Sequence, residues 1–292
     1  MNVRIIKLST LIDIGGKLIK FKLYLLTSLL VFSVQHYAQD FTVPESAAYD
    51  PATGCYYVSN YGNGNIIRIN PDGYKIIFQQ GLNKSLGMII CQKTLFVVEN
   101  FKNIRGFNLT DGSESLNLTI GEAQFLNDIT SDNNGLLYVT DSRAKAVYQI
   151  NPVEKTYVQF VKTKTDSPNG ILYDKWNNRL IVCYFTEKVC IDEINLEDST
   201  ISTLIPAGLT NLDGLTQDLQ GNIYVSTWGP GSFQTGFKKQ GAIYKFDNQF
   251  TNHPTVVADS LYGPADIFYN VEKKEMVIPL FLENTVHFLS LQ

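Results

Sequence analysis

Three features of the 292-residue sequence predict an all-β fold. Short stretches alternate between apolar and polar residues, which is the pattern of strands with one buried face. Gly, Asn and Asp turns separate these stretches, and helical periodicity is essentially absent after residue 38. The third feature is an internal repeat of about 40 residues, the size of one propeller blade. We therefore expect a six-bladed β-propeller of four-stranded antiparallel blades.

The repeat occurs six times, and each unit contains a short apolar strand, a polar turn, an alternating strand, another turn and a third strand. One residue near the start of each unit, here called the anchor, recurs after 41, 41, 42, 44 and 52 residues. The last spacing is stretched by an insert between Gly229 and Gln240. The units begin at Glu45, Ser85, Leu126, Pro168, Leu212 and Pro264, and their anchors are Glu45, Leu86, Asn127, Asn169, Asp213 and Ala265.

The N-terminus has the pattern of a secretory signal peptide. Basic residues precede the apolar run from Leu23 to Val34, which is shorter than the roughly 20 residues that span a bilayer. We expect residues 1–38 to be this signal, cleaved after Ala38, and residues 39–292 to be the propeller. An uncleaved membrane anchor is the alternative, because His36 is not the small residue that usually precedes a cleavage site. Either reading places the propeller outside the cytoplasm, as a secreted or periplasmic protein.

The net charge of the chain limits the kinds of partner that it can bind. The chain has a formal net charge of -4, and most of the N-terminal charge is basic, so the propeller itself is more acidic. An acidic surface repels phosphate backbones, which argues against nucleic acid and, after signal cleavage, against an anionic membrane. We expect a monomer that binds a small molecule.

The cysteines do not form a metal motif. None of the four makes a CxxC pair, and only His253 and His287 follow the signal segment, so a structural zinc site is not expected. Each cysteine lies in an apolar strand, where it can simply be a small buried side chain. Two predicted strands joined by a turn near Thr186 place Cys183 opposite Cys190, within reach of a disulfide.

The six anchors are the candidate functional residues. The first strand of each blade lines the central channel, so equivalent residues form a ring around one opening. Four of the six anchors are oxygen donors: Glu45, Asn127, Asn169 and Asp213. Carboxylate and carboxamide oxygens suit a divalent cation such as calcium. The alternative is a metal-free set of hydrogen-bonded turn residues, but two converging carboxylates would then repel each other or take up a proton.

The segments PES, FLND, SPNG and LDG, spaced one blade apart, resemble the senescence marker protein, regucalcin and gluconolactonase family of six-bladed propellers. In that family a Glu, an Asn and an Asp hold one divalent cation, with a further Asn close by. The resemblance implies that Glu45, Asn169 and Asp213, with Asn127, are metal ligands and that Asp213 is also catalytic. The cofactor would be Ca²⁺, with Mn²⁺ or Zn²⁺ as alternatives. The implied activity is hydrolysis of a lactone or ester, in which the cation polarises the carbonyl and Asp213 helps to activate water.

The chain departs from the family at the pocket. Phe125 stands where the sugar-lactone hydrolases often have an arginine, which favours a less polar ligand. Tyr184, Trp228 and Phe281 end predicted second strands and either wall a pocket or belong to the core. Asn60, Asn100 and Asp141 end second strands in the other blades and either reach the same opening or cap turns.

Two functions remain open from the sequence. The first is a metal-dependent hydrolase of the lactonase or esterase type. The second is a non-catalytic propeller resembling NHL-repeat proteins, which acts as a ligand- or protein-binding scaffold, because one fold hosts both.

One further expectation concerns closure of the ring. The last unit shows three strand-like runs before the chain ends, and the run from Asp40 to Val43 has no evident partner. We expect this run to pair with Thr285–Leu291 as the missing strand, because an unpaired edge is prone to aggregation.

Overall fold

The computed structural model describes residues 6–14, 17–25, 40–187, 191–205 and 209–291. The chain divides into two compact units, Met1–Tyr37 and Ala38–Gln292. In the first unit, β1 (Ile6–Ile14) and β2 (Lys17–Leu25) pair as an antiparallel hairpin. The predicted signal peptide and its cleavage site stay predictions. Among the described residues, none belongs to a helix of the length and apolarity that a membrane span requires.

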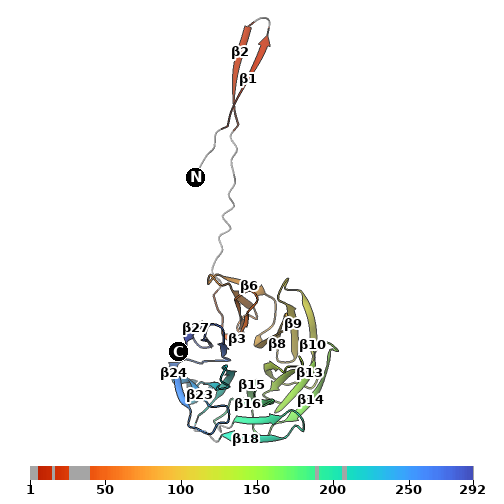
Figure 1. Ribbon diagram of the computed structural model, residues 1–292, viewed down its shortest axis with the longest axis vertical. Helices are drawn as coiled ribbons and strands as arrows, with labels where there is room; N and C mark the ends of the chain where they lie inside the picture. The colour runs from red at the N-terminus through yellow and green to blue at the C-terminus, as the bar shows by residue number, and fades with distance from the viewer. Residues whose placement is uncertain (1–5, 15–16, 26–39, 188–190, 206–208, 292) are drawn as a thin grey trace. The chain divides into compact units, whose positions relative to one another are not determined.

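The second unit is a ring of small antiparallel sheets (Figure 1). Five sheets have four strands and the sixth has three among the described residues, so the predicted six-bladed β-propeller is confirmed. The blades are β3 (Pro44–Asp50), β4 (Cys55–Asn60), β5 (Ile66–Ile69) and β6 (Lys75–Gln79); β7 (Ser85–Cys91), β8 (Thr94–Glu99), β9 (Asn103–Asn108) and β10 (Glu114–Thr119); β11 (Leu126–Ser131), β12 (Leu137–Asp141), β13 (Ala146–Asn151) and β14 (Thr156–Lys162); β15 (Pro168–Asp174), β16 (Arg179–Tyr184), β17 (Ile191–Asn195) and β18 (Ile201–Ile205); β19 (Leu212–Gln217), β20 (Ile223–Thr227), β23 (Gly241–Phe246) and β24 (Thr255–Leu261); and β25 (Phe268–Asn270), β26 (Glu275–Leu280) and β27 (Thr285–Ser290). The insert of the fifth blade forms a small hairpin of its own, β21 (Gly231–Ser232) and β22 (Gly236–Phe237).

Burial follows the position of each strand in its blade. The second strands are almost wholly buried, whereas outer strands such as β10 and β14 are largely exposed. A second strand is covered on both faces by neighbouring blades, which explains why it is apolar almost throughout rather than alternating.

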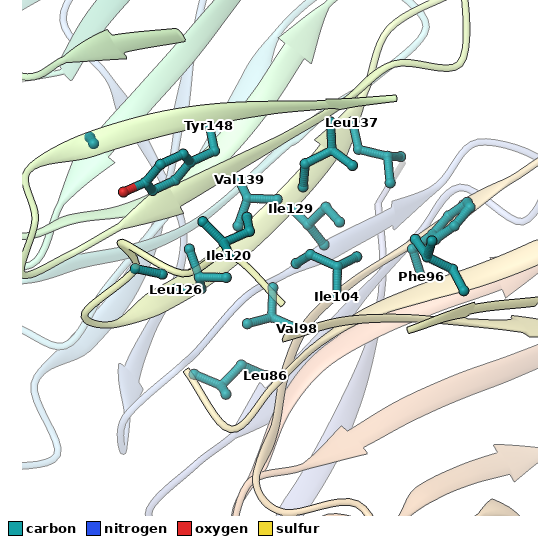
Figure 2. Close-up of a cluster of buried hydrophobic side chains, with 14 residues drawn as sticks. Leu86, Phe96, Val98, Ile104, Ile120, Leu126, Ile129, Leu137, Val139 and Tyr148 are labelled. Atoms are coloured by element: carbon teal, nitrogen blue, oxygen red, sulfur yellow. The ribbon is translucent and has the colours of Figure 1, made fainter. Parts of the chain in front are cut away.

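Six hydrophobic clusters occupy the six interfaces between adjacent blades. The largest lies between the second and third blades and brings together side chains such as Val98, Ile104, Ile129 and Val139 (Figure 2). Because no blade buries its apolar faces alone, closure of the ring completes the core.

The predicted closing strand is wrong. Asp40–Val43 is not in a strand, and its backbone carbonyls accept hydrogen bonds from Tyr61 and Gly62 of the first blade. It still contacts the sixth blade, because the Val43 N–H donates to Asn284 Oδ1 over 2.7 Å. The turn of the first blade outcompetes the edge of β27 for these backbone groups.

Contacts between the first and sixth blades close the ring instead. The Asp266 N–H donates to the Glu45 carbonyl over 2.9 Å, and Ser46 Oγ donates to Asp266 Oδ2 over 2.6 Å. Farther out, Asn270 Nδ2 donates to the hydroxyl of Tyr56 over 2.7 Å. Two of these bonds involve side chains that are buried, where a lost partner costs more than in water.

The predicted cysteine pairing is shifted by one residue. Cys183 is paired with Ile191 between β16 and β17, and Cys183 is a free thiol. Cys190 lies outside the described residues. The thiol of Cys183 donates to the Asp213 carbonyl over 3.2 Å, so its side chain faces the next blade.

Candidate functional site

The anchors share one backbone register. In each of the first five blades, the residue before the anchor pairs with the end of the second strand, and pairing resumes only three residues later. The partner strand advances by two residues over the same interval, which defines a β-bulge. Bulges redirect side chains and are common beside functional sites. The repeated bulge explains why the anchor side chains turn toward one place.

All four predicted oxygen donors line a single cavity of about 560 Å³. Glu45, Asn127, Asn169 and Asp213 are 6%, 9%, 6% and 6% exposed, respectively. The anchor Leu86 lines the same cavity, whereas the anchor Ala265 is buried and is not among the lining residues. Four blades therefore contribute polar, buried side chains to one cavity.

Three oxygens at this position have no hydrogen-bond partner among the described residues. They are Glu45 Oε2, Asn127 Oδ1 and Asn169 Oδ1. A buried acceptor without a partner costs about 1–3 kcal/mol, so such atoms in a native protein call for a ligand. Two carboxylates and two amides form a hard oxygen donor set, which fits Ca²⁺. Among the described residues, no group of three or more His, Cys, Asp or Glu side chains is placed to hold a metal ion, so a cation at this position would also need the Asn amide oxygens.

The carboxyl groups of the channel destabilise one another's charged forms. Burial, followed by repulsion from Asp213, Asp266 and Asp128, raises the pKa of Glu45 well above its usual range. Burial, followed by repulsion from Asp128, raises the pKa of Asp213 to about 8, although the nearby Trp228 indole acts to lower it. Burial also raises the pKa of Asp128 to about 7. A cation among these groups would stabilise their charged forms.

A tier of small and acidic residues lies immediately after the anchors. Glycines occupy this position in three blades because a side chain would not fit. A Cβ on Gly170 would lie 2.2 Å from the Asp213 carbonyl oxygen, and a Cβ on Gly214 would lie 2.4 Å from the Cα of Asp266. At these glycines the inner strands pack more closely than a Cβ atom allows, which fixes the anchor backbones.

Side chains of second strands hold the anchor carbonyls of the following blade. Each donates one hydrogen bond across a blade interface, so each anchor is fixed by its neighbour as well as by its own sheet. The bonds run from Thr140 Oγ1 to Asn169 O (2.6 Å), from Cys183 Sγ to Asp213 O (3.2 Å) and from Ser226 Oγ to Ala265 O (2.8 Å).

Aromatic side chains surround the oxygen donors. We call six of the lining residues the aromatic collar: Tyr61, Phe125, Phe185, Trp228, Phe233 and Phe281. Ring centroids lie 5.5 Å apart for Tyr61 and Phe281, 5.3 Å for Phe281 and Trp228, and 5.2 Å for Trp228 and Phe185. Phe101 joins the other side of the collar, with its ring 6.2 Å from Tyr61 and 4.3 Å from Phe125. The collar gives the cavity an apolar wall above a polar base.

The second-strand aromatics were predicted only in part. Trp228 and Phe281 line the cavity, but Tyr184 does not: it is buried, and its hydroxyl donates to Asp192 Oδ2 over 2.6 Å. The register assigns Phe185 to the cavity in its place, because Tyr184 pairs with Pro168, the residue before the anchor. A one-residue offset inverts the direction of a side chain on a strand.

The polar residues at the ends of the other second strands form hydrogen bonds with neighbouring turns and loops. Asn60 Oδ1 accepts the backbone N–H of Thr42, and Asn60 Nδ2 donates to the carbonyls of Val58 and Asn65. Asn100 Oδ1 accepts a hydrogen bond from the side-chain amide of Asn83. Asp141 accepts four backbone N–H groups, from Gln124, Phe125, Arg143 and Ala144. None of the three end residues lines the cavity.

No protein-family model matches this chain, and no curated protein matches it. Several solved structures are similar to it. A gluconolactonase from Xanthomonas campestris has a TM-score of 0.70 and 16% identity, over 88% of this chain and 88% of that chain. A virginiamycin B lyase from Staphylococcus aureus has a TM-score of 0.61 and 16% identity, over 87% and 86% of the two chains. The structure of a nidogen/laminin complex has a TM-score of 0.64 and 13% identity, over 78% and 91%.

At these identities the likeness establishes the propeller fold. The family resemblance drawn from the sequence is therefore supported for the fold, and the metal, the activity and the location outside the cytoplasm remain proposals.

Proposed function

We propose that this protein is a divalent-metal-dependent hydrolase of a lactone or ester, secreted or periplasmic. The observation that carries the proposal is the set of three buried, unpartnered oxygens, which lie with the Asp213 carboxylate in one cavity. The similar gluconolactonase shows that a propeller of this kind supports lactone hydrolysis in another protein.

The residues have distinct roles in this proposal. Glu45, Asn127, Asn169 and Asp213 would hold the cation, which when bound supplies Lewis-acid polarisation of the substrate carbonyl. Asp213 accepts the proton of the attacking water. Burial raises the pKa of Asp213 to about 8 in the metal-free protein, so the bound cation would be needed to keep this carboxylate ionised at neutral pH. The Cys183 thiol and the close packing of Gly170 keep the Asp213 backbone in place.

Histidine chemistry does not fit the cavity. The virginiamycin B lyase is catalytically inactive when one histidine is replaced by alanine. In this chain neither His253 nor His287 is among the cavity residues of the described structure. A hydrolase that uses a carboxylate therefore agrees better with these residues than a lyase that depends on a histidine.

A binding scaffold is the second candidate, favoured by the likeness to a propeller in the nidogen/laminin complex. In that case the cation would be structural or absent. Turnover separates the two functions.

The test is an assay of the purified protein with Ca²⁺, Mn²⁺ or Zn²⁺ on a panel of lactones and aryl esters. We expect metal-dependent turnover in wild type and its loss in Asp213→Asn. Asp259→Asn should keep wild-type rates, because it removes an exposed carboxylate of β24 that does not line the cavity. Absence of metal-dependent turnover on every substrate would favour the scaffold.

A further inference from the structure

The aromatic collar is interrupted on one side. Its rings follow one another from Phe185 through Trp228 and Phe281 to Tyr61, and the ring of Phe101, which is outside the collar, connects Tyr61 to Phe125. Between Phe125 and Phe185, the cavity is lined instead by Ser142, Arg143 and Ser167, from the third and fourth blades. We call these three residues the polar gap.

Arg143 is the cationic member of the polar gap. Its guanidinium lies 5.2 Å from the centroid of the Phe125 ring, and no ion pair of the described residues includes it. The fully buried Asp141 accepts the backbone N–H of Phe125 over 3.0 Å and that of Arg143 over 3.1 Å. One carboxylate thus fixes the backbone of both residues, and the exposed Arg143 side chain presents its guanidinium, a group suited to a planar anion, beside the Phe125 ring.

The charges of the cavity indicate the charge of its ligand. Among the lining residues, Glu45 and Asp213 would balance a bound divalent cation, and Arg143 supplies the one further charge, which is positive; Asp128 and Asp266 are buried nearby but do not line the cavity. The Ser142 hydroxyl is already used, since it donates to the Pro168 carbonyl over 2.7 Å. A monoanionic ligand would complement this distribution.

We propose that the cavity takes a lactone or ester with an aromatic or bulky apolar body and one carboxylate, which pairs with Arg143 in the polar gap. This substrate class rests on the hydrolase function proposed above. The apolar body contacts the collar, including Phe233 on the β21–β22 hairpin, which is 68% exposed although it lines the cavity.

Fluorescence of Trp228 gives a direct readout of ligand binding. The chain has two tryptophans, and Trp176 is 54% exposed, so Trp176→Phe leaves the buried Trp228 in the collar as the reporter. The probes are 3-phenylpropanoate and its neutral analogue 3-phenylpropanol, titrated into Ca²⁺-loaded protein. We expect about tenfold tighter binding of the carboxylate, as for a charge-assisted hydrogen bond.

Two variants locate the two parts of the ligand. Arg143→Gln should abolish the preference for the carboxylate, whereas Lys162→Gln, which removes an exposed positive charge from the same blade, should keep it. Phe233→Ala should weaken both probes about three- to tenfold, the range of an aromatic contact. Equal binding of the two probes, or a preference that survives Arg143→Gln because the carboxylate binds the cation, would overturn the proposal.

The readout is independent of turnover. Binding of phenylpropanoate that depends on Arg143, without hydrolysis of any lactone, would support the ligand class and contradict the hydrolase. Turnover of lactones with no effect of Arg143→Gln, or tighter binding of glucono-δ-lactone than of phenylpropanoate, would support the hydrolase and contradict the ligand class.

Discussion

Replacement of Asn169 by leucine should make the metal-free protein more stable and abolish its response to metal. Asn169 is 6% exposed, and its Oδ1 has no partner among the described residues. An unpaired buried acceptor costs about 1–3 kcal/mol, and an apolar side chain of similar size removes that cost. A domain of this size changes its melting temperature by roughly 2–4 °C per kcal/mol, so we expect a rise of about 2–12 °C.

Added metal should make wild type melt at a higher temperature relative to Asn169→Leu than it does in chelator. A ligand present at 100 times its Kd stabilises the folded state by about 2.7 kcal/mol. Wild type should gain this stability when Ca²⁺ is added, whereas Asn169→Leu should gain none because one ligand of the cation is missing. Thermal melting in chelator and in excess Ca²⁺ measures both effects in the same samples.

A surface variant supplies the control. Asn117 lies on the outer strand β10 and is exposed, so Asn117→Leu should change stability by less than about 0.5 kcal/mol and leave the metal response intact. The reasoning is refuted if Asn169→Leu melts below wild type in chelator, or if Ca²⁺ stabilises the variant as much as wild type.

Three more outcomes are expected. Gly170→Ala should cost about 1–3 kcal/mol and reduce metal-dependent turnover, because its Cβ would lie 2.2 Å from the Asp213 carbonyl oxygen; Gly121→Ala, whose nearest neighbour would be 3.6 Å away, should do neither. In chelator, the melting temperature should fall as pH rises toward 8. Folding raises the pKa of Asp213 from 3.8 to about 8, so its stabilisation of the folded state is complete below about pH 4 and is lost above pH 8. A melting temperature that rises over this range would contradict the burial of a carboxyl without a neutralising partner. Cys183, whose thiol pKa is raised chiefly by burial, should react with iodoacetamide only after unfolding, whereas the half-buried Cys91 reacts in the native protein; equal rates in a mass-spectrometric time course would be inconsistent with the observed packing.

The sequence predicted the fold and the anchor register because both depend on repetition. Strand alternation and turn residues recur in every unit, so errors in one unit are corrected by the others. Glu45, Asn127, Asn169 and Asp213 were found in this way, as polar residues at a position that Leu86 and Ala265 show to be free of any structural need for polarity. The structure brings all four to one cavity.

Features that depend on a single residue step or on one local competition were harder to predict. Tyr184 was named where Phe185 lines the cavity, because the bulge that sets the register leaves no mark in the sequence. The N-terminal run was assigned to β27, but the turn of the first blade binds its carbonyls instead. Edge pairing and turn contacts involve the same backbone groups, and sequence pattern alone does not rank them.

The polar gap was missed for a different reason. Arg143 lies within the turn between β12 and β13, where a charged side chain is ordinary, and its position beside Phe125 depends on Asp141 accepting both backbone N–H groups. The signal that could have found it is the aspartate at the end of the second strand, a residue type that favours turns and caps backbone donors.

Calorimetric titration of Ca²⁺ into the purified, chelator-treated protein tests the central claim most directly. We predict one site per chain in wild type, with loss of binding in Asp213→Asn and in Asn169→Leu and retention in Asn117→Leu. No heat of binding from Ca²⁺, Mn²⁺ or Zn²⁺ in wild type, or undiminished binding in both site variants, would contradict the assignment of these oxygens to a cation.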